Sequence, residues 1–131
     1  MQVRVRKITN LAKDTNSFEL VHPDGAELPP FEAGAHINIH LPDGFIRQYS
    51  LCNSPSERQR YQIAVLHERN GRGGSARVHE HVRAGDLIEI SEPRNHFPLD
   101  ESADNYLLIA GGIGVTPIKA MAERLHALGA N

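Results

Sequence analysis

The sequence lacks the marks of several protein classes. It has one cysteine, Cys52, and no tryptophan among its 131 residues. A single cysteine excludes an intrachain disulfide and any multi-cysteine zinc or iron–sulfur site within this chain. No apolar run approaches the roughly eighteen residues of a membrane span, and the alternating N-terminus is unlike the core of a signal peptide. These absences predict a cytoplasmic protein with no membrane partner. Cys52 follows the RQYSL run of a predicted strand and is expected to be a small buried residue, with a thiol beside a bound ring or a reactive thiol as the alternative.

The chain also lacks a large excess of charge of one sign. Its formal net charge is −2. Domains that bind nucleic acids are normally basic, so we expect no nucleic-acid partner, and the arginines are of interest as local ligands for an anion.

The eight histidines do not show the spacing of a metal site. His79 and His81 lie two positions apart on a predicted helix and face different ways. His36 and His40 lie about 13 Å apart along a predicted strand. We therefore predict no metal site.

Short alternating runs of apolar and polar residues dominate roughly the first ninety positions. They cover residues 3–8, 17–22, 36–41, 47–51 and 61–66, and turns rich in proline, glycine and aspartate separate them. Such runs are typical of half-buried antiparallel strands, and they predict a mainly β fold, a small barrel of six strands. One short helix is expected over 75–82, with Ser75 as a candidate cap.

The pattern changes class near residue 104. An apolar run at 106–110 predicts a buried strand, residues 111–114 form a glycine turn, and 117–128 show helical periodicity. Thr116 is a candidate cap for this helix, and Pro117 is expected at its first position. A buried parallel strand needs neighbours on both sides, so we expect either a piece of a longer protein or pairing of 106–110 with another molecule, as in a dimer.

Two segments carry the strongest functional signal. Residues 47–50 (RQYS) offer a guanidinium, an aromatic ring and a hydroxyl, while residues 71–75 (GRGGS) offer a second guanidinium and glycines that let the backbone approach a phosphate closely. Together they suit a phosphorylated flat ring such as flavin mononucleotide (FMN). Taken singly, each has an alternative: an ordinary barrel strand and a glycine-rich loop without a ligand.

Residues 111–117 (GGIGVTP) follow the apolar run 106–110 as a dinucleotide-binding turn would. The segment differs from the G-x-G-x-x-G pattern and lacks the acidic residue about twenty positions further on. Its glycines would let a pyrophosphate reach the start of the following helix. A turn without a ligand is the alternative.

Four motifs in order, RQYSLCN, IAVLHERNGRGGSARVHEHV, GDLIEISEPRNHFPLD and LLIAGGIGVTPIKAM, resemble the phthalate dioxygenase reductase family. That family includes the reductase components of vanillate O-demethylases and belongs to the ferredoxin–NADP reductase superfamily. The resemblance implies a six-stranded antiparallel Greek-key flavin-binding barrel with one small helix at 1–99. It also implies the first strand and helix of an α/β nucleotide-binding domain at 100–131, with a [2Fe–2S] domain only in a full-length form.

The resemblance also implies roles for particular residues. Arg47 and Arg72 would bind the flavin phosphate, Tyr49 would lie against the ring and the ribityl chain, and Ser50 would be the catalytic residue near flavin N5. The implied flavin site comprises Arg47, Gln48, Tyr49, Ser50, Ile63, Val65, Leu66, Arg72, Gly73, Gly74 and Ser75. The implied NAD(P) site comprises Gly111, Gly112, Gly114, Thr116 and Pro117.

The implied function is electron transfer from NAD(P)H through FMN to an iron–sulfur centre and an oxygenase or ferredoxin-type acceptor. Two arginines suit a terminal phosphate, which favours FMN, with FAD as the alternative cofactor. The segment 93–99 is expected to link the two domains, with Asn95 and Phe97 as residues that could border the flavin. Two further alternatives are a non-catalytic barrel that binds a partner and a fragment that serves in assembly.

Overall fold

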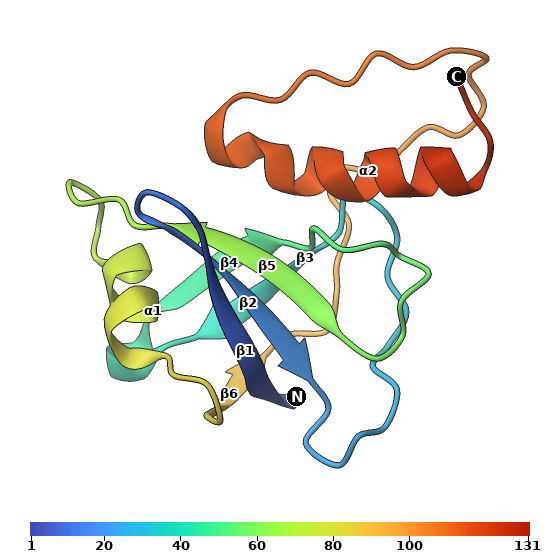
Figure 1. The fold of residues 1–131 in the computed structure, drawn as a ribbon. Coiled ribbons are helices and arrows are strands. Elements are labelled where there is room, and N and C mark those ends of the chain that lie inside the picture. The colour runs from blue at the N-terminus through green and yellow to red at the C-terminus, as the bar shows by residue number, and fades with distance from the viewer.

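A curled sheet of six antiparallel strands forms most of this computed structural model, which describes residues 1–131 (Figure 1). The strands are β1 (Gln2–Ala12), β2 (Thr15–Val21), β3 (His36–His40), β4 (Ile46–Ser50), β5 (Tyr61–Leu66) and β6 (Leu87–Ile90). Their order in the sheet is β4-β3-β6-β1-β2-β5. Because β5 pairs with β2, and β6 returns to lie between β1 and β3, the connections are of the Greek-key type. The predicted six-stranded antiparallel barrel is confirmed.

The core lies inside the curl of the sheet. Alternate residues of the strands point inward and are fully buried, among them Val3 and Val5 of β1 and Phe18 and Leu20 of β2. Each such side chain contributes about 1.5–3 kcal/mol through its burial. Tyr61 is also buried, and its hydroxyl donates a hydrogen bond of 2.6 Å to the carbonyl of Pro29.

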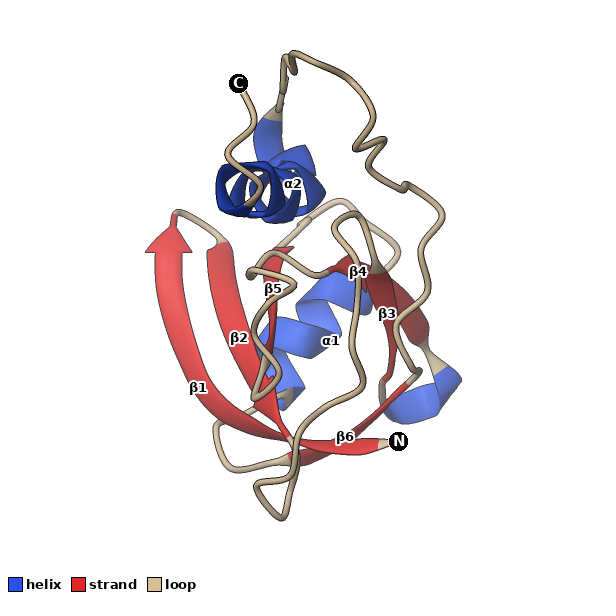
Figure 2. Ribbon diagram, turned by 90° about the vertical axis from the view of Figure 1, so that its right-hand side faces the viewer, coloured by secondary structure: helices blue, strands red, loops and turns tan.

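Helix α1 (Gly74–His81) lies between β5 and β4, the two edges of the sheet (Figure 2). Val78 on its inner face joins the core. The prediction that Ser75 caps this helix is wrong. Gly73 takes the cap position with φ 87°, a left-handed conformation that glycine adopts at little cost. Ser75 therefore lies inside the helix, where its hydroxyl accepts a hydrogen bond of 3.0 Å from the backbone N–H of Glu68.

Helix α2 (Val115–Ala127) lies across one end of the barrel (Figure 1). It follows the 3-10 turn η2 (Gly112–Gly114), while a second such turn, η1 (Pro42–Gly44), connects β3 to β4. Thr116 and Pro117 do not begin the helix as predicted, because Gly114 occupies the cap position and Thr116 donates to the carbonyl of Ile113 at 3.1 Å. Neither α1 nor α2 has the length and hydrophobicity of a membrane-spanning helix.

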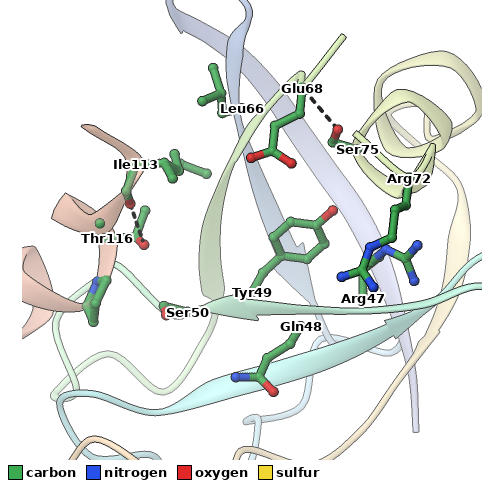
Figure 3. A pocket seen from close by; sticks show the side chains of 14 residues that line it. Arg47, Gln48, Tyr49, Ser50, Leu66, Glu68, Arg72, Ser75, Ile113 and Thr116 are labelled. Carbon is green, nitrogen blue, oxygen red and sulfur yellow. Dashed lines mark hydrogen bonds between the residues drawn. The ribbon is translucent and has the colours of Figure 1, made fainter. Parts of the chain in front are cut away.

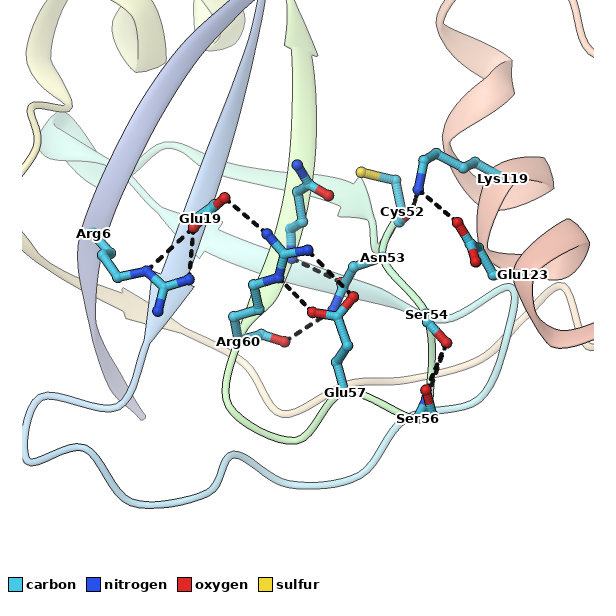
Figure 4. Close-up of polar contacts among 11 residues, drawn as sticks. Arg6, Glu19, Cys52, Asn53, Ser54, Ser56, Glu57, Arg60, Lys119 and Glu123 are labelled. Atoms are coloured by element: carbon cyan, nitrogen blue, oxygen red, sulfur yellow. Dashed lines mark hydrogen bonds and ion pairs between the residues drawn. The ribbon is translucent and has the colours of Figure 1, made fainter. Parts of the chain in front are cut away.

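The contact between α2 and the barrel combines a small apolar cluster with one polar tie. Ala120 and Met121 pack on Ala33 of the barrel. The ammonium of Lys119 donates a hydrogen bond of 3.1 Å to the carbonyl of Cys52 (Figure 4). Cys52 is buried as expected, and burial raises the pKa of its thiol.

The strand predicted at 106–110 is not formed. The segment runs without ladder hydrogen bonds, and the backbone N–H of Tyr106 donates instead to the carbonyl of Asn131 at 3.0 Å. Leu107 and Ile109 are 84% and 77% exposed. A strand requires a partner for its backbone groups, and no other segment of the chain pairs with this one.

Polar contacts fix the connection between β4 and β5 (Figure 4). The amide of the buried Asn53 accepts from the N–H of Gln62 at 2.9 Å and donates to the carbonyl of Arg60 at 3.0 Å. The guanidinium of Arg60 in turn bonds Glu57 and Glu19. The end of β4 is thereby held beside β5.

Candidate functional site

A cavity of about 410 Å³ lies between β4, the end of β5, the start of α1 and the turn before α2 (Figure 3). Its volume falls in the range of about 300–1,000 Å³ that is common for small-molecule sites. It is lined by Arg47, Gln48, Tyr49, Ser50, Ala64, Leu66, Glu68, Arg72, Gly74, Ser75, Ile113, Gly114, Thr116 and Pro117. The RQYS and GRGGS segments, far apart in the sequence, therefore meet in one place.

Strand β4 places a guanidinium group, a phenol ring and a hydroxyl group one after another along the cavity. Arg47 and Tyr49 point to the same side, as strand alternation predicts, and Arg47 lies with Arg72 at one end (Figure 3). Tyr49 lies in the middle, and burial raises the pKa of its phenol, so the hydroxyl stays protonated and can donate. Ser50 lies toward Thr116 at the other end, and its hydroxyl makes no hydrogen bond within the chain.

The arginine end of the cavity is electropositive. The guanidinium of Arg47 donates only to the carbonyl of Ile46, at 2.8 Å, and neither Arg47 nor Arg72 forms an ion pair with a carboxylate. The first N–H groups of α1, at Gly74 and Ser75, lie at the same end and have no partner within the helix. Guanidinium groups and a helix start together favour an anion such as a phosphate.

Gly74 allows Arg47 to lie across the start of α1. A Cβ at this position would lie 2.6 Å from Cγ and 2.8 Å from Cδ of Arg47, well inside normal contact. The ring of Phe45 lies close to two guanidinium groups, with the Cζ of Arg47 at 5.1 Å and that of Arg77 at 3.8 Å from the ring centroid. A glycine is thus required at position 74 because the side chain of Arg47 passes close to its backbone.

Of the three residues expected from strand β5, only Leu66 has its side chain in the cavity. Ala64 and Leu66 line the cavity, whereas Ile63 and Val65 point into the barrel core and are 0% and 1% exposed. Alternation along β5 turns Ala64 and Leu66 toward the cavity and Ile63 and Val65 toward the core. Gly73 caps α1 and does not line the cavity either.

The glycine turn before α2 forms the wall next to Ser50. Gly114, Thr116 and Pro117 line the cavity, while Gly111 and Gly112 do not. The predicted flavin site and the predicted NAD(P) turn are therefore adjacent.

Sequence reasoning missed three lining residues, Ala64, Glu68 and Ile113. Ala64 and Glu68 lie at alternate positions with Leu66, so strand alternation was the signal that could have identified them. Asn95 and Phe97 lie away from this cavity. Asn95 donates to the carbonyl of Ala33 at 3.1 Å, and its carboxamide oxygen accepts from the N–H of Phe97, so the linker is fastened to the barrel.

A second cavity, of about 560 Å³, lies between the barrel and the far end of α2. Its lining includes Glu32, Asp100 and Glu101. The one guanidinium there, on Arg124, is engaged by both carboxylate oxygens of Glu101 at 2.6 and 3.0 Å. This cavity therefore offers no free cation to a phosphate.

A Greek-key barrel with an electropositive cavity beside a glycine turn and helix is the architecture of the flavin-dependent oxidoreductase domains that the sequence resembles. A family model described as the oxidoreductase FAD-binding domain matches residues 2–98, and the chain belongs to this family. A flavin is accordingly the class of cofactor. The amides and guanidinium groups at the start of α1 fit the phosphate of such a group.

Relatives agree with this assignment. The chain is 52% identical over 131 residues to the reductase subunit of a tert-butanol monooxygenase / tert-amyl alcohol desaturase from Aquincola tertiaricarbonis, covering 100% of the chain and 39% of the relative. It is 51% identical over 127 residues to a vanillate O-demethylase oxidoreductase from Pseudomonas sp. (strain HR199 / DSM 7063), covering 97% and 40%.

A solved structure of phthalate dioxygenase reductase is also similar. It is described as a modular structure for electron transfer from pyridine nucleotides to [2Fe–2S], and it superposes with a TM-score of 0.97 at 48% identity, covering 100% of this chain and 41% of that one. The chain thus spans about two fifths of the length of these relatives. The resemblance to phthalate dioxygenase and vanillate O-demethylase reductases is confirmed.

Proposed function

We propose that the 410 Å³ cavity binds FMN, with the phosphate between Arg47, Arg72 and the start of α1. The observation that carries this proposal is the pair of guanidinium groups without carboxylate partners at a helix start. A terminal phosphate carries more charge than either phosphate of a bridging pyrophosphate, so two guanidinium groups favour FMN over FAD. Ser75 adds a hydroxyl at the same end.

The rest of the cavity suits the flat ring and its side chain. Tyr49 packs against the ring and the ribityl chain, Leu66 supplies apolar surface, and the Ser50 hydroxyl hydrogen-bonds flavin N5 and so holds a proton there. Gln48 also lines the cavity, while Ile63, Val65 and Gly73 contribute backbone groups or support the lining residues. In this assignment Ser50 is the catalytic residue.

The chain serves as the flavin-binding part of an NAD(P)H-dependent reductase, with residues 1–99 as the barrel and 100–131 as the start of a nucleotide-binding domain. A bound flavin supplies the chemistry of accepting two electrons together and passing them on singly. The turn at 111–117 lies where NAD(P)H would approach the Ser50 end of the cavity, through Gly111, Gly112, Gly114, Thr116 and Pro117. The electron acceptor is an iron–sulfur centre followed by an oxygenase, as the descriptions of the relatives suggest.

The test is the identity of the cofactor that copurifies with the chain. We expect a yellow protein whose visible spectrum is that of a flavin and whose released cofactor has the mass of FMN. Release of FAD would retain the flavin site and overturn the choice of FMN. A colourless protein that takes up neither flavin on titration would overturn the site.

A further inference from the structure

Glu68 places a carboxylate in a cavity whose charged end is otherwise formed by guanidinium groups. It lies two residues beyond the end of β5, on the side of the strand that carries Ala64 and Leu66, and it lines the cavity. Its side chain turns inward above the ring of Tyr49 (Figure 3). The hydrogen bond from its backbone N–H to the hydroxyl of Ser75 fixes this position relative to α1.

The carboxylate of Glu68 has no partner within the chain. It forms no hydrogen bond and no ion pair, although Arg47 and Arg72 line the same cavity. The side chain folds back over the glycine loop, since a Cβ at Gly71 would lie 3.2 Å from its Oε2 atom. A structural salt bridge therefore does not explain this residue, and its acceptor oxygens remain available to a ligand.

The position of Glu68 between the two ends of the cavity limits what that ligand group can be. A carboxylate repels a phosphate, so the group beside it must be a hydrogen-bond donor. Its charge also reaches the hydroxyl of Tyr49: burial is the main cause of the raised pKa of Tyr49, Arg47 lowers that pKa, and Glu68 adds to the increase. A chain of hydroxyl groups between a ring at the Ser50 end and a phosphate at the arginine end would meet these conditions.

We propose that Glu68 accepts hydrogen bonds from the hydroxyl groups of the polyol chain of the flavin, and that it thereby makes the site select ribityl flavins over the isoalloxazine ring alone. This inference rests on the proposed flavin site. Arg47 and Arg72 would bind the phosphate, and Glu68 would bind the hydroxyl groups of the polyol chain.

The experiment compares three ligands that differ by one feature each. Lumiflavin has the ring alone, riboflavin adds the ribityl chain, and FMN adds the phosphate. In Glu68→Ala we expect the ratio of riboflavin to lumiflavin affinity to fall about tenfold, because hydrogen bonds to a charged acceptor are lost. In Glu68→Gln, which keeps one neutral acceptor, we expect a fall of about threefold. The ratio of FMN to riboflavin affinity should not fall, since removing the carboxylate also removes its repulsion of the phosphate.

Glu80→Ala is the matched control, because Glu80 is an exposed carboxylate of α1 that does not line the cavity. Its two ratios should equal those of the unsubstituted chain. An unchanged riboflavin-to-lumiflavin ratio in Glu68→Ala, or an equal loss for all three ligands, would overturn the inference and leave the flavin site intact. Failure of the unsubstituted chain to bind any of the three would instead overturn the proposed function.

Discussion

At Gly74, the absence of a side chain allows Arg47 to reach the phosphate end of the cavity. We predict that Gly74→Ala weakens FMN binding about tenfold and changes riboflavin binding less, because the new methyl group would displace the guanidinium that is proposed to bind the phosphate. Fluorescence titration of the two ligands measures the difference.

Gly111→Ala is the control for this substitution. Gly111 does not line the cavity, and a Cβ there would have nothing within 4 Å. Equal losses for FMN and riboflavin in Gly74→Ala would show that the methyl group disturbs the barrel and not the phosphate contact.

Single residues of the site were predictable on β4, where residues 47–50 carry the polar and aromatic groups that a ligand requires. Arg47 and Tyr49 share a face of β4 and both line the cavity, as alternation indicates. On β5 the predicted site included Ile63 and Val65 as well as Leu66, and alternation from Leu66 would have selected Ala64 in their place. The same alternation extends to Glu68, but this residue follows the strand in a loop, where side-chain direction also depends on the turn.

At the scale of elements, the carboxylate of Glu19 on β2 forms ion pairs that connect this strand to β1 and to the start of β5. This carboxylate accepts from Arg6 of β1 at 2.7 Å and from Arg60, which directly precedes β5, at 2.8 Å (Figure 4). The hydrogen bond from Arg6 is the largest cause that holds the pKa of Glu19 below its ordinary value of 4.5. A lowered pKa in the folded state contributes stability above that value, and this contribution disappears as the pH falls through the folded pKa.

We therefore predict that Glu19→Gln lowers the free energy of unfolding by about 1–2 kcal/mol at neutral pH and by much less at about pH 3. Urea unfolding at the two pH values measures both differences. Glu80→Gln, on the exposed face of α1, should change stability by less than about 0.5 kcal/mol at either pH. The same loss for Glu19→Gln at both pH values would contradict an electrostatic origin.

The elements themselves were predictable to different degrees. Alternation located most of the six strands, because each has one face in the core. The cap residues predicted for both helices were wrong. At the start of α1, glycine and serine both suit a cap, so the residue types in Gly73-Gly74-Ser75 could not show which residue takes that position. The segment 106–110 has the composition of a strand, yet a strand also requires a neighbour, which composition does not report.

At the scale of the whole molecule, the segment 106–110 leaves apolar side chains in solvent. Leu107 and Ile109 are 84% and 77% exposed, and their backbone groups lack ladder partners. Unpaired segments of this kind tend to pair with another chain. We predict self-association that increases with concentration in sedimentation velocity, and its loss when both residues are replaced by lysine.

Leu11→Lys is the matched control for this prediction, because Leu11 is 57% exposed on β1, away from the segment. It should associate like the unsubstituted chain. A clean monomer of the unsubstituted chain over the whole concentration range would contradict assembly through 106–110.

Titration of the chain with FMN and riboflavin tests the claim that this molecule holds a flavin with its phosphate between Arg47 and Arg72. Arg47→Ala and Arg72→Ala should each weaken FMN binding by about tenfold or more and riboflavin binding by less than about threefold, because only FMN carries the phosphate. Equal weakening of both ligands would contradict the claim.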